Sequence, residues 1–240
     1  YKQSLEADGI DCSALKLESG APTGSALIMF DQEGDNYISV ASGANACLTP
    51  ECITSVEQSI AESSWIILQQ EIPYETTVEV LRVAAKHARP VLLNYAPASD
   101  LRLRPGPAIH GLVVNEHEAA ALLDRPLPEE DMDLIREAAS DLLESGAHQF
   151  VVITLGAAGL LLADATGIRN LPAFKVVAVD TTAAGDTFCG ALVAALSEGK
   201  SLDEAARFAS AASALSVTKI GAQGSIPTRL SITEFLEGKV

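Results

Sequence analysis

The sequence predicts an α/β protein with a doubly wound, mostly parallel sheet flanked by helices, and a short β-hairpin near the N-terminus. Short apolar runs alternate with stretches of helical pattern, and polar residues repeatedly follow the ends of those runs. Two short alternating runs near the N-terminus break this pattern. With 240 residues, 48% hydrophobic and 20% charged, the chain can bury a substantial core as one domain, or as one domain with a small appendage.

The central strands are predicted from apolar runs that are rich in β-branched residues. They fall at residues 65–68, 91–94, 111–115 and 151–154. Helical patterns lie between and around them. One helix opens at Thr49 with Pro50 in its first position, and others cover residues 75–87 and 129–143. Ligands bind beyond the carboxyl ends of strands in such sheets, so the polar residues found there are expected to share one cleft.

Two segments read as β-hairpins. Residues 24–30 and 37–41 alternate around a glycine-containing loop, which predicts a hairpin of its own or, alternatively, an edge hairpin of the main sheet. Residues 151–155 and 160–163 flank a glycine turn and predict an antiparallel hairpin at the far side of the sheet.

Two helices are expected near the C-terminus. The first runs from Asp186 and places a core stripe on one face, made of Phe188, Ala191, Leu192 and Ala195. The second opens at a capping box of Ser201 and Glu204. It is rich in small residues, which allow close approach either to a neighbouring helix or to the flat base of a nucleotide.

Charge and cysteine content exclude several classes of function. A formal net charge of -16 without a Lys/Arg run argues against nucleic-acid or anionic-membrane partners. The 4 cysteines lack CxxC spacing, so neither a zinc site nor a disulfide framework is expected. No run of about 18 apolar residues and no signal pattern occurs, which favours a cytoplasmic protein.

The segment 176–192 is typical of phosphoryl transfer. A strand leads through small residues into a helix that begins with a carboxylate, and Ala183, Ala184 and Gly185 let backbone N–H groups approach an anion. Asp186 would stand beside the phosphate as a general base. The alternative is an ordinary turn with Asp186 as a capping residue. A P-loop mechanism is excluded, because no Gly-Lys-Ser/Thr loop is present.

Read as a whole, Asp-Thr-Thr-Ala-Ala-Gly-Asp-Thr-Phe at 180–188 resembles the C-terminal signature of the ribokinase (PfkB-type) sugar kinases. Further segments look like the family's other landmarks, in the family's order: residues 68–73, 93–98, 114–118, 153–159 and 219–227. The resemblance implies a ribokinase-like kinase domain over residues 1–240, with residues 22–42 as the hairpin of the lid. The family's opening βαβ segment, which carries a substrate-binding Asp and a Gly-Gly motif, is absent, so the domain is expected to be N-terminally incomplete.

The resemblance also implies an activity. The γ-phosphoryl of ATP would pass to a primary hydroxyl of a pentose, with D-ribose to ribose 5-phosphate as the favoured reaction. Asp186 would take the hydroxyl proton, and the backbone of Ala183, Ala184, Gly185 and Asp186 would form an anion hole. Glu71 would contact the sugar hydroxyls together with Asp186.

Cofactor sites follow from the same resemblance. Asn115 and Glu118 match a pair that positions phosphate and hydrated Mg²⁺, although Glu118 alone would read as an acid in the first turn of a helix. The nucleotide would contact Gly185, Ser210 and the turn of Thr154, Leu155, Gly156, Ala157, Ala158 and Gly159. A K⁺ activator would be held by the side chains of Asp180 and Ser225 and the carbonyls of Thr182, Ser216, Lys219 and Gly221.

The expected partners are a small sugar and ATP, with a homodimer through the lid as a further possibility. Alternatives stay open: a kinase for deoxyribose, another sugar or a nucleoside, or a catalytically inactive fragment that only binds ligand. A dinucleotide-dependent oxidoreductase fits the βα alternation, but no Gly-x-Gly-x-x-Gly turn follows a strand.

Overall fold

A computed structural model describes residues 2–30, 36–98, 109–128, 131–145 and 149–239. Its main sheet has six strands in the order β3-β4-β5-β6-β7-β8. β3 to β6 are parallel, and β7 and β8 are antiparallel, which confirms the mostly parallel sheet and the antiparallel hairpin of β6 and β7. The strands are β3 (Ile66–Leu68), β4 (Val91–Asn94), β5 (Ile109–Asn115), β6 (Phe150–Thr154), β7 (Leu160–Asp164) and β8 (Gly167–Leu171).

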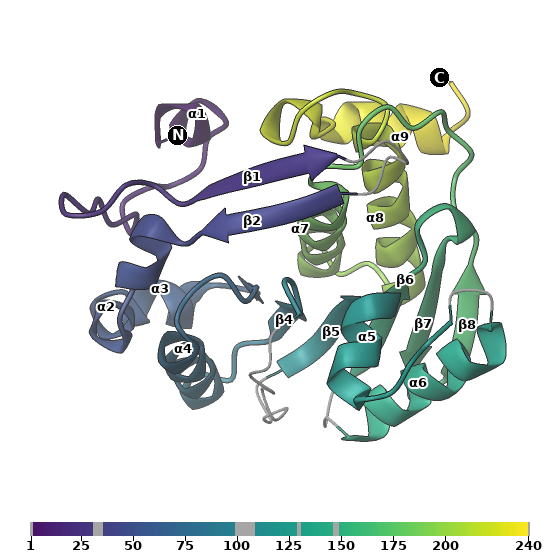
Figure 1. The fold of residues 1–240 in the computed structure, drawn as a ribbon, viewed down its shortest axis with the longest axis horizontal. Coiled ribbons are helices and arrows are strands. Elements are labelled where there is room, and N and C mark those ends of the chain that lie inside the picture. Colours follow the sequence, from purple (N-terminus) through teal and green to yellow (C-terminus); the bar gives the residue numbers. More distant parts are fainter. Residues whose placement is uncertain (1, 31–35, 99–108, 129–130, 146–148, 240) are drawn as a thin grey trace.

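The strand side chains pack in alternation on the two faces of the sheet. Leu92 and Val113 belong to one buried cluster, whereas their neighbours Leu93 and Val114 belong to another. The first cluster lies under α7 (Ala184–Ser197), α8 (Leu202–Ser216) and α9 (Arg229–Leu236). The second lies under α4 (Tyr74–Lys86), α5 (Glu116–Leu123) and α6 (Met132–Ser145), so helices cover both faces, as the doubly wound prediction requires (Figure 1).

The N-terminal hairpin forms a sheet of its own. β1 (Ser25–Phe30) pairs with β2 (Asn36–Ala41) in antiparallel register, and Figure 1 shows this ribbon apart from the six-stranded sheet. The alternative of an edge hairpin in the main sheet is therefore wrong. The predicted loop at residues 31–35 lies outside the described residues. Leu27 and Val40 are 63% and 50% exposed, so this ribbon leaves apolar side chains uncovered.

Helix boundaries follow local chemistry closely. The helix that opens at Thr49 is α2 (Pro50–Ser55), and it breaks at Val56 before α3 (Glu57–Glu62). The predicted start of α6 at residue 129 lies outside the described residues. β8, α1 (Lys2–Ala7), α9 and short 3-10 turns at Gly43–Cys47, Gly156–Ala158 and Gln223–Ser225 were not predicted. Within the described ranges, no helix has the length and apolar character that a bilayer crossing needs.

Candidate active site

The N-terminus of α7 has an unusual backbone. Ala183, its N-cap, has φ 59° and ψ 17°, a left-handed conformation that costs a residue with a Cβ atom about 1–2 kcal/mol. The helix begins at Ala184, so the prediction that it begins with the Asp186 carboxylate is wrong by two positions. The reason is that the left-handed turn at Ala183 already directs the chain into the helix, and the first helical bond runs from Thr187 N–H to Ala183 O at 2.9 Å.

This helix end is open rather than capped. No side chain caps it, so the alternative in which Asp186 serves as the capping residue is wrong. The first N–H groups of a helix have no intrahelical acceptor, and among the described residues only that of Ala184 is satisfied, by Thr181 O at 3.2 Å. Gly185 and Asp186 are exposed, and a Cβ atom added at Gly185 would meet nothing within 4 Å. Two N–H donors next to the Asp186 carboxylate therefore have no described acceptor and belong to exposed residues.

Asp180 joins this turn to the segment after α8. Its Oδ1 accepts from Thr182 N–H at 2.9 Å, and its Oδ2 accepts from Gly221 N–H at 2.8 Å. Hydrogen bonds from Thr182, and then from Gly221, hold the pKa of the Asp180 carboxyl below its usual value. Val179 N–H also donates to Val217 O at 2.7 Å. Residues expected to bind one cation thus come together across 41 positions of sequence.

The other residues assigned to the cation lie in the same segment. Ser216 and Ser225 are fully buried, and their hydroxyls donate to Ser213 O and Ala222 O. Ser216 O accepts from Lys219 N–H at 3.1 Å, while the Lys219 side chain is exposed. Each hydroxyl oxygen keeps lone pairs that no described donor uses. The described residues contain no group of three or more His, Cys, Asp and Glu that could hold a metal, so a cation here would depend on the Asp180 carboxylate together with backbone and hydroxyl oxygens.

Asn115 and Glu118 form a reciprocal capping box at the start of α5. The Asn115 side chain accepts from Glu118 N–H, and the Glu118 carboxylate accepts from Asn115 N–H, both at 2.8 Å. Burial raises the pKa of Glu118, against the lowering effect of the Asn115 N–H. Burial, followed by the charges of Asp186 and Glu118, raises the pKa of the Cys189 thiol to about 12. The charges of both carboxylates therefore act on one buried thiol.

The glycine turn after β6 lies next to Asn115, at the start of the α5 capping box. Thr154 is the register partner of Asn115, and its hydroxyl donates to Val114 O at 3.3 Å. Leu155 N–H donates to Gly159 O at 2.8 Å, which closes the turn. Gly159 has φ 103°, and a Cβ atom there would lie 2.2 Å from Leu171 O. Only glycine fits that position, whereas Gly156, Ala157 and Ala158 are exposed.

Two assigned residues lack a direct link to this cluster. The Ser210 hydroxyl donates to Ala206 O at 2.9 Å within α8, so its proton is already used. Glu71 is exposed beyond β3. Across the described part of the chain, no hydrogen bond or ion pair joins the Glu71 side chain to the α7 N-terminus.

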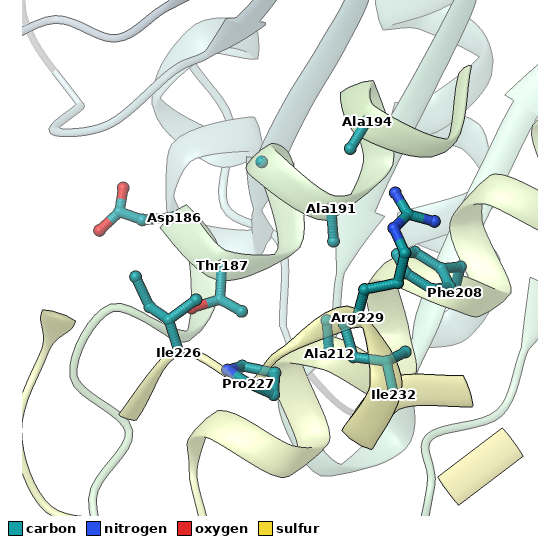
Figure 2. A pocket seen from close by; sticks show the side chains of 11 residues that line it. Asp186, Thr187, Ala191, Ala194, Phe208, Ala212, Ile226, Pro227, Arg229 and Ile232 are labelled. Atoms are coloured by element: carbon teal, nitrogen blue, oxygen red, sulfur yellow. The ribbon is translucent and has the colours of Figure 1, made fainter. Parts of the chain in front are cut away.

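The structure also shows a pocket that the sequence did not reveal (Figure 2). It has a volume of about 270 Å³, starts at Asp186 and extends between α7, α8 and α9. Ala191, expected in the core stripe of α7, packs against the core cluster but also lines this pocket, so it is only half-buried. The spacing of small residues along α7 was the sequence feature that could have revealed this pocket. The lining residues are Asp186, Thr187, Gly190, Ala191, Ala194, Phe208, Ala212, Ile226, Pro227, Arg229 and Ile232.

An open helix terminus beside a carboxylate, in a doubly wound α/β protein, is an arrangement that suits a phosphoryl-transfer protein. Known proteins agree. The description "pfkB family carbohydrate kinase" matches residues 1–229. The ribokinase of Haemophilus influenzae is 40% identical over 236 residues, which are 98% of this chain and 76% of that protein.

Solved structures of ribokinases are also similar to this chain. A ribokinase from Thermotoga maritima superposes with a TM-score of 0.84 at 38% identity, covering 98% of this chain and 76% of the other. A ribokinase from Arabidopsis thaliana, complexed with ribose and ATP, has a TM-score of 0.80 at 32% identity, covering 91% and 70%. The chain belongs to the pfkB family of carbohydrate kinases, which are phosphotransferases with an alcohol group as acceptor.

Proposed function

We propose that this protein transfers the γ-phosphoryl group of ATP to the primary hydroxyl of a pentose, with D-ribose as the substrate. The observation that carries the proposal is the uncapped N-terminus of α7, where the Gly185 and Asp186 N–H groups stand open beside the Asp186 carboxylate. The named relatives support the choice of sugar, because they are ribokinases and one was solved with ribose and ATP.

In this reaction the sugar oxygen forms a bond to the γ-phosphorus while the bond from that phosphorus to the β,γ-bridging oxygen breaks and ADP leaves. Asp186 accepts the hydroxyl proton, a role that typically contributes about 10²–10⁴-fold. The Gly185 and Asp186 N–H groups, which have no described acceptor, stabilise the negative charge on the transferring group. Glu71 holds other hydroxyls of the sugar.

Mg²⁺ would be held through water by Glu118, with Asn115 fixing the carboxylate. The geometry fits, because the capping box leaves Glu118 one carboxylate oxygen without a described partner. Burial makes its ionised form costly, and a nearby cation offsets that cost. The ion would neutralise charge on the phosphates. The nucleotide itself would lie along the turn 154–159 and near Ser210.

K⁺ would be held by Asp180 and Ser225 and by carbonyls of Thr182, Ser216, Lys219 and Gly221. The donor set fits, since these groups are oxygens and Asp180 already ties the two segments together. The ion would stabilise the turn that carries the anion hole. The β1–β2 ribbon would close over the sugar as a lid, and a homodimer through that lid belongs to the same proposal.

The test is a coupled assay of ADP release with ribose, deoxyribose, fructose and adenosine as acceptors, with and without Mg²⁺ and K⁺. We expect sugar-dependent turnover that is fastest with ribose, needs Mg²⁺ and rises with K⁺. A folded sample that binds ribose in calorimetry without releasing ADP would establish the ligand-binding alternative instead. Light scattering at increasing concentration tests the homodimer.

A further inference from the structure

The 4 cysteines of the chain lie in different surroundings. Cys12 and Cys189 are buried, whereas Cys47 and Cys52 are partly exposed. Burial raises the pKa of the Cys189 thiol to about 12, so this thiol is inert at neutral pH. A reagent in solution can reach Cys47 and Cys52, and the groups around each sulfur decide which of the two reacts.

Hydrogen-bond donors gather around the sulfur of Cys52. The Lys16 Nζ donates to the Cys52 Sγ at 3.8 Å, and the Thr49 Oγ1 lies 3.7 Å from the same sulfur. Hydrogen bonds from the Thr49 backbone and then from its hydroxyl, together with the Lys16 charge, lower the pKa of the Cys52 thiol. Among the described residues, no hydrogen bond reaches the Cys47 side chain. The two partly exposed thiols therefore differ in what stabilises their charged form.

Two other helices of this protein show what the position of Cys52 favours. In α5 and α8, the residue three positions after the N-cap is a glutamate, and its carboxylate accepts from the N–H of the N-cap residue. α2 has Thr49 as its N-cap, and Cys52 takes the corresponding position. A negatively charged acceptor forms stronger hydrogen bonds than a neutral one. The sulfur thus occupies a place that an ionised group takes elsewhere in the chain.

Lys16 reaches this sulfur from a distant part of the sequence, 36 positions away. Its ammonium also pairs with the Glu18 carboxylate at 3.2 Å. The Glu18 hydrogen bond, followed by the charge of Cys52, raises the pKa of Lys16, so its ammonium stays charged beside the sulfur. The contact joins the segment before β1 to α2, which follows β2, and so it lies near one end of the β1–β2 ribbon (Figure 1).

We infer that Cys52 is a modification site, whose thiolate is held between Lys16 and Thr49 and reacts with peroxides and with alkylating electrophiles. With hydrogen peroxide, the sulfur attacks one oxygen, and an S–O bond forms as the O–O bond breaks. The other oxygen leaves as hydroxide and takes up a proton to become water. The sulfur thereby loses two electrons to the peroxide and becomes a sulfenic acid. This reaction needs no sugar or nucleotide, so the inference is independent of the proposed function.

The test uses the 240-residue chain without substrate. Iodoacetamide is added at neutral pH for a series of times, and peptide mapping by mass spectrometry gives the alkylation rate of each cysteine. We expect Cys52 to react at least about tenfold faster than Cys47, and the buried Cys12 and Cys189 to react more slowly still. Hydrogen peroxide followed by dimedone, which traps sulfenic acids, should place the adduct on Cys52.

Variants then test the neighbours of the sulfur. Lys16→Met removes the charge and should slow the alkylation of Cys52 at neutral pH by roughly three- to tenfold, with its rate profile moved to higher pH. Thr49→Val removes the hydroxyl and should also slow it. Lys2→Met is the matched control, because Lys2 pairs with Glu6 and should leave the rate unchanged. Circular dichroism confirms that each variant is folded.

Alkylation of Cys47 as fast as that of Cys52 overturns the inference. A Cys52 rate that Lys16→Met leaves unchanged overturns it as well, and so does a dimedone adduct that forms only on another cysteine. A disulfide that contains Cys52 supports it, because a sulfenic acid condenses with a second thiol. Loss of ADP release in Asp186→Asn with unchanged labelling of Cys52 leaves this inference intact, so the two proposals can fail separately.

Discussion

The N-termini of α5 and α7 differ in whether side chains satisfy their first N–H groups. Each helix starts with N–H groups that the helix itself cannot satisfy. In α5, Asn115 and Glu118 satisfy them reciprocally with two bonds of 2.8 Å. In α7, the N-cap is Ala183 in a left-handed conformation, and no side chain caps the helix.

The difference separates a terminus whose N–H groups are capped by side chains from an open terminus, to which the proposed function assigns an anion. A capped end stabilises its helix and holds Glu118 in a fixed, half-buried place. An uncapped end gives up that stability and keeps its donors and its dipole for an anion. α8 has a capping box of Ser201 and Glu204 like that of α5. The open N-terminus of α7 is therefore specific to that helix and is not shared by α5 or α8.

The largest expected effect comes from the open terminus. Asp186→Asn should lower kcat by about 10²–10⁴-fold, because the amide cannot accept the hydroxyl proton. Coupled ADP release measures the loss, and a thermal melt should show little change. Asp133→Asn is the matched control, since Asp133 occupies the first turn of α6 and should leave turnover unchanged. A variant at position 186 that keeps half of its activity would show that another group is the base.

The next effect sharpens the role of the capped terminus. Glu118→Gln keeps an oxygen that accepts from Asn115 N–H but removes the charge. We expect the Mg²⁺ concentration for half-maximal activity to rise by roughly 10–100-fold, by analogy with lost outer-shell groups at metal sites. Glu204→Gln makes the same change in the capping box of α8 and should leave the Mg²⁺ requirement unaltered. Equal effects of the two changes would contradict a magnesium role for Glu118.

A smaller effect is expected when the capping side chains themselves are removed. Asn115→Ala and Ser201→Ala should each lower the free energy of unfolding by about 1 kcal/mol, because each removes the side chain that accepts from the third N–H of its helix. Urea denaturation measures both losses. If Asn115→Ala costs no more than an exposed substitution such as Ala85→Ser, the capping box contributes nothing to stability.

The smallest effect is in the pH dependence. Burial raises the pKa of Glu118, so the folded state holds its proton more tightly than the unfolded state. The contribution of Glu118 to stability is therefore largest at low pH and falls as pH rises from its unfolded pKa through its folded pKa. The difference between wild type and Glu118→Gln in urea denaturation should decline over that interval and stay flat above it. A difference that grows with pH would mean that a cationic partner dominates.

Much of this architecture could be predicted, because it depends on local patterns. The sequence indicated β4, β5, β6 and β7 from apolar runs, and the α8 capping box from two residues three positions apart. The order of the motifs along the chain identified the family. β8 was missed because Gly167–Leu171 mixes polar and apolar residues and gains its strand structure by pairing with β7.

What the sequence determined by itself was therefore strands β3 to β7, the crossover helices between them and the residue types at their ends, since propensity and periodicity act over a few neighbours. The strand expected at the start of segment 176–192 is wrong, because residues 172–178 pair with no strand and Val177 is 83% exposed. Only the tertiary structure decided the left-handed turn at Ala183, the bond from Gly221 N–H to Asp180 across 41 positions and the pocket between α7, α8 and α9. Each of these depends on packing between segments distant in the chain, and no local pattern encodes that distance.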